Sequence, residues 1–139
     1  MSLALPLGGA AGVGEIEDGT AVDLTFDGGC GSVTIPAGEV VYTDPVDFDI
    51  GSQSMLTVDL YLENGQSGTA VTGHPGSRTT SWMQGGDLHA APSIPEVGTE
   101  HWYFLTAIEA WAPGTTSALV VLGDSISDGR GSDDNKNNR

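Results

Sequence analysis

A serine near the end of the chain stands in a setting that suits a nucleophile. It belongs to the segment Gly123-Asp124-Ser125-Ile126-Ser127-Asp128-Gly129, which directly follows the apolar run Ala118-Leu119-Val120-Val121-Leu122. A serine at the carboxyl end of a buried parallel strand, followed by a turn, is where α/β hydrolytic enzymes expose a nucleophile. Glycine lets the backbone approach a reacting carbonyl, and N–H groups of the turn can donate to the developing oxyanion. The pattern therefore predicts that Ser125 attacks a carbonyl carbon.

The segment differs from the nucleophile elbow of the α/β-hydrolase fold, Gly-x-Ser-x-Gly, because Ser127 stands where that motif needs glycine. Residues 119–129 resemble instead the first conserved block of the GDSL/SGNH hydrolases, whose Gly-Asp-Ser serine attacks an ester or thioester. The resemblance implies that Ser125 is the nucleophile and that its own N–H helps to hold the oxyanion. Gly123 and Asp124 would support the turn, with Asp124 ordering it rather than serving as the acid of a triad. The substrate would be a small-molecule or glycan ester.

Further segments extend the resemblance to most of residues 20–139, within a secreted bacterial and fungal branch of that family. Arg130-Gly131-Ser132 and Asn137-Asn138-Arg139 resemble the loop after the nucleophile. Residues 32–38, 42–46, 60–62 and 72–80 resemble the β-sandwich region that precedes the catalytic domain of that branch. His74 and Arg78 lie in the last of these segments and are candidates for the rim of the site. The branch suggests secretion, although the opening residues lack the basic region of a signal peptide.

The other catalytic blocks of the family do not occur in this chain. They follow the nucleophile and supply an oxyanion-hole glycine, an asparagine and an Asp-x-x-His that carries the acid and the base, whereas this chain stops at Arg139. An unactivated serine hydroxyl is a weak nucleophile. We therefore expect the chain to be inactive alone and to require the missing C-terminal catalytic segment or a partner chain.

An upstream histidine could in principle supply the base, because triads occur in any chain order. His74, His89 and His101 all precede the serine, and Asp87-Leu88-His89 has the wrong spacing for Asp-x-x-His. We expect His74 in a turn beside Pro75, His89 on a loop and His101 on the exposed face of its strand.

A rival interpretation is a carbohydrate-binding β-sandwich module without catalysis, in which Gly-Asp-Ser is a remnant. Trp82, Trp102, Tyr103 and Trp111 could line a sugar-binding face. The same aromatic residues could equally pack in the core and at its rim. Substitution of Ser125 or of the tryptophans would separate the two functions.

The sequence gives no pattern for a metal or a cofactor. Asp124 and Asp128 occupy EF-hand-like positions, but Ile126 and Asn135 stand at the third and twelfth positions, where the loop needs an oxygen ligand and a bidentate Glu. The chain has neither a metal-spaced His/Cys set nor a Gly-rich phosphate cradle. We therefore expect no metal and no cofactor.

The charge balance excludes two classes of partner. Nineteen acidic residues face 4 basic ones, which gives a formal net charge of −15, and Arg78 is the only basic residue before Arg130. Nucleic acid and anionic membranes need a basic face to displace their counterions.

The single cysteine, Cys30, cannot form an intrachain disulfide. No run approaches the ~18 apolar residues of a membrane span.

Short strands joined by many turns are expected, because the 139 residues include 21 glycines. Alternating or β-branched patterns predict strands at residues 22–26, 33–35, 40–42, 46–50, 56–62 and 101–111. Residues 63–100 would form a long loop unless short irregular strands pass through it. The unbroken apolar run 118–122 is typical of a parallel strand buried on both faces.

Together these patterns predict a mainly β fold in three parts. Residues 1–20 would be an irregular N-terminal segment, and residues 21–112 a jelly-roll-like β-sandwich. Residues 113–139, after a boundary near Pro113, would hold the first strand and nucleophile loop of an α/β SGNH domain. The polar tail Ser132 to Arg139, taken alone, has the composition of a disordered segment. Left uncovered, residues 118–122 would be an aggregation hazard, so another polypeptide should cover them.

Overall fold

The fold is built from short antiparallel strands with one turn of 3-10 helix. The computed structural model describes residues 1–94 and 97–136. Its elements in chain order are β1 (Ser2–Ala4), η1 (Leu7–Gly9), β2 (Val22–Asp23), β3 (Thr57–Asp59), β4 (Gly73–Pro75), β5 (Ser81–Met83), β6 (Val97–Thr99) and β7 (His101–Tyr103). The β-rich class predicted from the sequence is confirmed. Among the described residues, no helix is long and apolar enough to cross a bilayer.

The first residues of the chain form the central strand of a three-stranded sheet in the order β2-β1-β3. Leu3 pairs with Val22 on one side and with Val58 on the other. A central strand covered on both faces is buried throughout, and Ser2, Leu3 and Ala4 are all buried. The predicted irregular segment 1–20 is therefore wrong for β1, whose three residues are too few to show a period.

The small core follows the alternation predicted for residues 22–26. Leu24 and Phe26 point inward and are buried, whereas Asp23 between Val22 and Leu24 is exposed. Leu24 extends β2 by donating its N–H to the Met1 carbonyl over 2.9 Å. Burial of these side chains with Leu3 removes apolar surface from water, which is the main force that holds this sheet in place.

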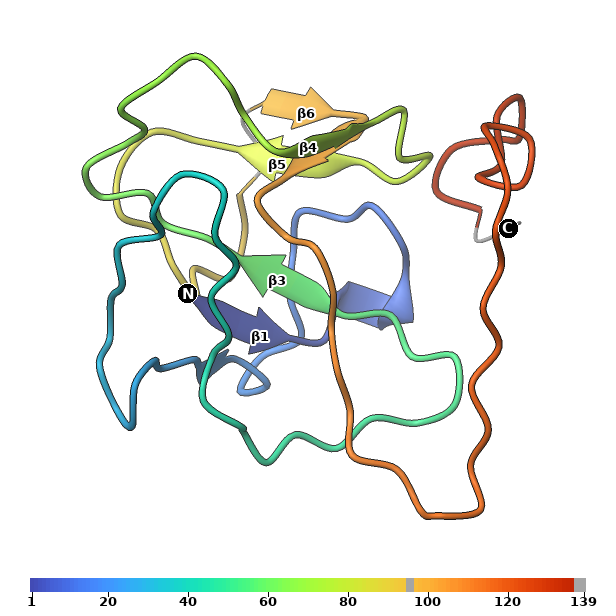
Figure 1. Cartoon of the computed structure of the whole chain (residues 1–139), viewed down its shortest axis with the longest axis horizontal. Helices are drawn as coiled ribbons and strands as arrows, with labels where there is room; N and C mark the ends of the chain where they lie inside the picture. Colours follow the sequence, from blue (N-terminus) through green and yellow to red (C-terminus); the bar gives the residue numbers. More distant parts are fainter. Residues whose placement is uncertain (95–96, 137–139) are drawn as a thin grey trace.

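Two two-stranded sheets, β4 with β7 and β5 with β6, lie together above the three-stranded sheet (Figure 1). Opposite pairs are His74 with Trp102 in the first and Trp82 with Gly98 in the second. The short irregular strands allowed for residues 63–100 are therefore present as β4, β5 and β6. His74 lies in β4 rather than in a turn, and β7 ends at Tyr103, so the strand predicted over 101–111 is too long.

The strands predicted at 33–35, 40–42 and 46–50 are absent, and the strand predicted at 56–62 shortens to β3. Ile35, Val40 and Ile50 are exposed, with 51%, 59% and 42% of their surface accessible. β-branched residues favour strands only where a neighbouring strand can pair with them, and no strand of the described residues pairs with this loop. The loop contains a turn after Pro36, which is closed by the Glu39 N–H donating to the Pro36 carbonyl.

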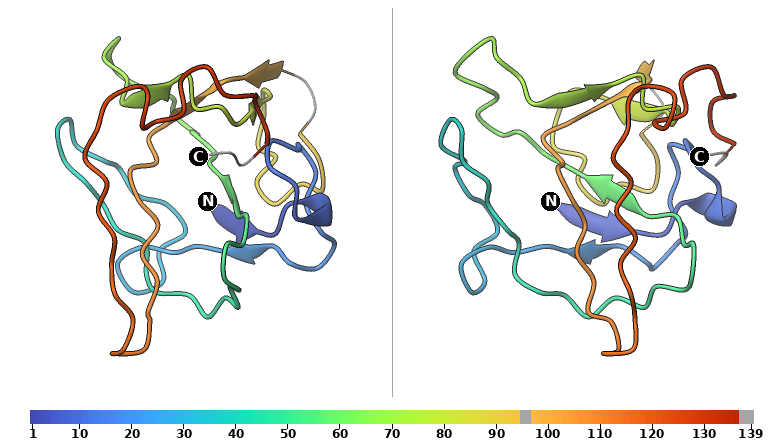
Figure 2. Two further views of the ribbon diagram at one scale, coloured as in Figure 1. Left: turned by 90° about the vertical axis from the view of Figure 1, so that its right-hand side faces the viewer. Right: turned by 45° about the vertical axis from the view of Figure 1, so that its right-hand side comes forward.

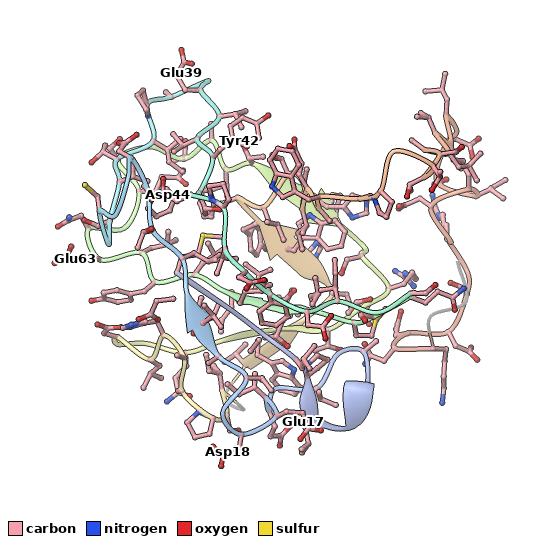
Figure 3. All side chains as sticks on the ribbon, turned by 90° about the horizontal axis from the view of Figure 1, so that it is seen from below. Glu17, Asp18, Glu39, Tyr42, Asp44 and Glu63 are labelled. Carbon is pink, nitrogen blue, oxygen red and sulfur yellow. The ribbon has the colours of Figure 1, made fainter. Side chains whose placement is uncertain are left out.

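A carboxylate ties this loop to the core. The Asp44 side chain accepts hydrogen bonds from the Gly28 and Gly29 N–H groups, at 2.9 Å each, and from the Thr25 hydroxyl at 2.7 Å. In Figure 3 Glu39 lies at the outer tip of the loop and Asp44 lies nearer the body of the molecule. These bonds, the Gly28 N–H first and the Thr25 hydroxyl second, hold the pKa of Asp44 below its ordinary value of 3.8.

After β7 the chain leaves the body and returns, forming an open excursion of residues 105–122 that we call the arm (Figures 1 and 2). A β-turn closes its tip, with Thr116 N–H donating to the Pro113 carbonyl over 2.8 Å. The buried parallel strand predicted for 118–122 is wrong: the segment is not a strand, and Leu119, Val120, Val121 and Leu122 are 70% to 98% exposed. A strand needs an adjacent edge, and no described strand lies beside this segment.

The Asp44 bonds predict a specific pH dependence. A carboxyl whose pKa is lowered by folding stabilises the fold above its ordinary pKa of 3.8, and this stabilisation disappears as the pH falls through the folded value. In thermal unfolding followed by circular dichroism, Asp44→Asn should lower the Tm at pH 6, and the difference from the parent chain should shrink below pH 4. Asp47→Asn, an exposed carboxyl on the same loop, is the control. Equal effects of the two variants at every pH would contradict this role.

The uncovered arm predicts self-association. An extended apolar segment with unpaired backbone groups is a template for pairing with other chains. Val120→Lys should reduce the light scattering of a concentrated solution while leaving the Tm nearly unchanged, because Val120 is 87% exposed. The comparison variant is Thr115→Lys, which places lysine at an exposed but polar position at the tip of the arm. Equal scattering from the parent chain and Val120→Lys would show that the arm does not drive association.

Candidate active site

The turn that carries Ser125 is closed by its own hydrogen bonds. The Asp124 carboxylate accepts from the Ile126 N–H at 2.9 Å, and the Asp124 carbonyl accepts from the Ser127 hydroxyl at 2.9 Å. The Arg130 N–H donates to the Ser125 carbonyl over 2.7 Å. Gly123 is required because a β-carbon there would collide with the Ser127 side chain. Asp124 and Gly123 thus act on the shape of the turn.

Ser125 is exposed at this turn, and neither its N–H nor its hydroxyl makes a hydrogen bond to any described residue. The three histidines are engaged elsewhere. His74 lies 3.2 Å from Asp128, His89 lies 2.8 Å from Asp87, and His101 lies near the Tyr103 ring. Within the described part of the chain, the serine therefore faces solvent without a histidine base in contact.

A cavity of about 420 Å³ opens beside the serine. Its walls come from the end of β4 with the turn that follows it, and from the serine turn: Pro75, Gly76, Arg78, Ser125, Asp128 and Arg130. The tertiary structure thus brings Arg78 to the cavity that Ser125 lines. His74 lies behind it, with Nε2 on the Asp128 carboxylate and its ring stacked on Trp102 at a centroid distance of 4.8 Å. A second cavity of about 470 Å³, lined by Thr80 before β5 and by residues 98–101 of β6 and the start of β7, contains none of the predicted site residues.

Arg78 is held in place from several sides. Its guanidinium lies 3.5 Å from Glu100 and 3.3 Å from Asp134, and its Nε donates to the Gly76 carbonyl over 3.2 Å. Its backbone has a φ of 55°, in the left-handed region that costs a non-glycine residue free energy. Surrounding contacts must offset that cost, so the position of Arg78 is set by its neighbours.

The polar tail is docked on the same turn. The Thr80 N–H donates to the Asn135 amide oxygen at 2.8 Å, the Asn135 amide nitrogen donates to the Thr80 hydroxyl at 2.9 Å, and the Asn135 N–H donates to the Arg78 carbonyl at 2.9 Å. Figures 1 and 2 show residues 124–136 folded against the turn between β4 and β5. The disorder expected for the tail is wrong for residues 132–136; the segment Asn137-Asn138-Arg139 lies outside the described residues.

The aromatic residues of the rival interpretation do not form one surface. The Trp82 Nε1–H donates to the Gly12 carbonyl over 3.0 Å, and its ring packs against Gly98. Trp102 and Tyr103 are neighbours in β7, so they point to opposite faces. Trp111 is 95% exposed on the arm. The three tryptophans therefore have separate surroundings: Trp82 packs against Gly98, Trp102 stacks on His74, and Trp111 is exposed.

A second histidine cluster lies outside the serine site. His89 Nδ1 is 2.8 Å from an Asp87 oxygen, and its Nε2 is 4.0 Å from Asp23. The Asp87 hydrogen bond raises the pKa of His89 above 6.5, and the same bond lowers the pKa of Asp87. Among the described residues, no group of three or more His, Cys, Asp or Glu side chains could hold a metal ion.

Asp128, Arg130 and Asn135 were not assigned roles from the sequence. Asp128 and Arg130 stand within the segment that resembles the nucleophile block, so their nearness to Ser125 could have been found from spacing. The partner of Asn135 lies 55 residues away, at Thr80. No local pattern marks such a contact.

The docking of the tail can be tested by proteolysis. Asn135→Ala removes two side-chain hydrogen bonds, each worth about 1 kcal/mol. The fraction of molecules with a detached serine turn should rise about thirtyfold, and trypsin cleavage after Arg130 should accelerate accordingly. The exposed neighbour Asp133 provides the control variant Asp133→Ala. Similar cleavage rates for both variants would mean that Asn135 does not hold the tail.

Comparisons of the chain with protein-family models, with curated proteins and with solved structures find no match. The candidate site of this chain consists of an exposed serine on an ordered turn and a cavity beside it, with two arginines in the wall of that cavity.

Proposed function

We propose that this chain supplies the nucleophile of a serine ester hydrolase of the GDSL/SGNH type. The observation that carries the proposal is the exposed Ser125 on a turn that its neighbours close, opening onto a cavity of about 420 Å³. Its oxygen would attack the ester carbonyl carbon, the alcohol would leave with a proton, and water would then release the acid from the acyl-serine. The free Ser125 N–H is available to donate to the oxyanion.

The proton of the Ser125 hydroxyl needs a base, and no histidine in the described part of the chain contacts this hydroxyl. By the family resemblance, an Asp-x-x-His would supply the acid and the base, and this motif is absent from the sequence. General base catalysis typically contributes about 10²- to 10⁴-fold to the rate. The chain alone would therefore react slowly and would be the N-terminal part of a complete enzyme.

The arm suggests where the completing polypeptide would lie. Residues 118–122 are apolar without alternation, and Leu119 to Leu122 are exposed on both sides of the extended backbone. In the complete enzyme this segment would become the buried first strand of the α/β domain, and residues 21–112 would form the preceding β-sandwich. Pairing and burial of the segment would bring the base and acid to the carboxyl end of the strand, beside Ser125.

Acylation by an activated ester tests Ser125 directly. Incubation with p-nitrophenyl acetate should leave an acetyl group on Ser125. The acyl-serine should persist because no base activates a water molecule to hydrolyse it. Peptide mass spectrometry should find Ser125 at least about tenfold more acetylated than Ser117, an exposed serine of the arm. Ser125→Ala should abolish this adduct, and Ser117→Ala should leave it intact. Equal acetylation of the two serines would refute the nucleophile.

Two other results would redirect the interpretation. Multiple turnover that Ser125→Ala abolishes would show that an upstream histidine or a bound partner completes the site. Glycan binding that Trp102→Ala or Trp111→Ala removes and Ser125→Ala does not would favour the carbohydrate-binding module. Intact mass must confirm that the tested chain ends at Arg139.

A further inference from the structure

The cavity beside Ser125 concentrates positive charge in an acidic protein. The chain has 4 basic residues against 19 acidic ones, and two of the four, Arg78 and Arg130, line this one cavity. Arg78 comes from the turn after β4, whereas Arg130 comes from the serine turn. Two guanidinium groups from separate segments therefore meet at the candidate nucleophile, against the overall charge of −15.

The two arginines differ in what they already bind. Arg78 faces Glu100 and Asp134, and its side chain is only 24% exposed, so its charge is balanced within the protein. Asp128, the acidic residue of the cavity wall, faces His74. Arg130 is exposed and forms no ion pair with a carboxylate among residues 1–94 and 97–136. One cationic group is thus left to face a ligand.

Arg130 is also held close to the nucleophile. Its N–H donates to the Ser125 carbonyl over 2.7 Å, so this hydrogen bond keeps the backbones of the two residues close in space. A guanidinium presents a planar set of donors that matches a carboxylate in two parallel hydrogen bonds. A cavity of about 420 Å³ falls within the range of small-molecule sites.

We propose that Arg130 binds a carboxylate of the substrate, so that the ester cleaved at Ser125 carries a negative charge near the ester group; the second half of this inference rests on the proposed hydrolase function. A single unpaired guanidinium balances one negative charge. The Asp128 carboxylate in the same wall repels any anion, and it repels a doubly charged phosphate about twice as strongly as a singly charged carboxylate. The ligand chemistry that fits is therefore a monoanionic carboxylate.

The carboxylate could belong to either half of the ester. In monomethyl succinate it lies on the acyl side, and in an O-acetylated glucuronic acid it lies on the alcohol side. Dimethyl succinate has the same skeleton as the first compound without the charge. Binding of these three compounds to the full chain, followed by NMR shifts of the Ser125 amide and the Arg130 Nε–H, assigns the side on which the carboxylate lies.

Variants of Arg130 and Lys136, which are both exposed, distinguish a specific carboxylate site from a general electrostatic attraction. Arg130→Gln should weaken binding of the charged ester by about tenfold or more, and Arg130→Lys by less, because lysine keeps the charge but not the planar donors. Lys136→Gln removes the same charge from the tail and should leave binding unchanged. Tm values close to that of the parent chain would show that the variants are folded.

Each result has a definite meaning. Dimethyl succinate binding as tightly as the charged esters, or equal losses in Arg130→Gln and Lys136→Gln, would overturn the carboxylate site. Absence of binding by both charged esters would do the same. If binding of the charged esters depends on Arg130 but Ser125 is not acetylated, the carboxylate site is supported and the hydrolase function is refuted. Acetylation of Ser125 without such binding would do the reverse.

Discussion

The side-chain amide of Asn135 joins three parts of the chain that are far apart in sequence. It exchanges two hydrogen bonds with Thr80 in the turn before β5, and it covers Gly12, where any side chain would collide with it. Trp82 adds a bond from its indole to the Gly12 carbonyl. The arm makes no strand pairing among the described residues, so this contact, together with the His74–Asp128 and Arg78–Asp134 pairs, positions the Ser125 turn against the rest of the protein.

Ion pairs around the site position groups more than they stabilise the fold. Exposed pairs contribute about 0–1 kcal/mol each, because water and salt screen them. The contacts of Arg78 with Glu100 and Asp134 nevertheless fix one guanidinium and use up its charge. Arg130 forms no ion pair with a carboxylate of the described residues and lies beside the serine. The division of roles between the two arginines is the feature that gives the cavity a chemical preference.

Hydrophobic surface is distributed unevenly over the molecule. The buried apolar core is small and consists of Leu3, Ala4, Leu24 and Phe26, while residues 118–122 remain in water. Burying apolar surface stabilises by roughly 25 cal/mol per Å². A polypeptide that covered this segment would gain that free energy and would pair the open backbone. The arm is thus the part of the chain with the most to gain from a partner, which agrees with the proposal that this chain is part of a larger enzyme.

The sequence by itself determined the features that depend on near neighbours. These are the inward alternation of Leu24 and Phe26 and the β-rich class that many glycines and short apolar runs require. Only the tertiary structure decided which edges were available for pairing, so β1 became a central strand while residues 118–122 stayed unpaired. It also decided that Arg78 would meet Ser125, because contacts between distant segments leave no periodic trace in either one.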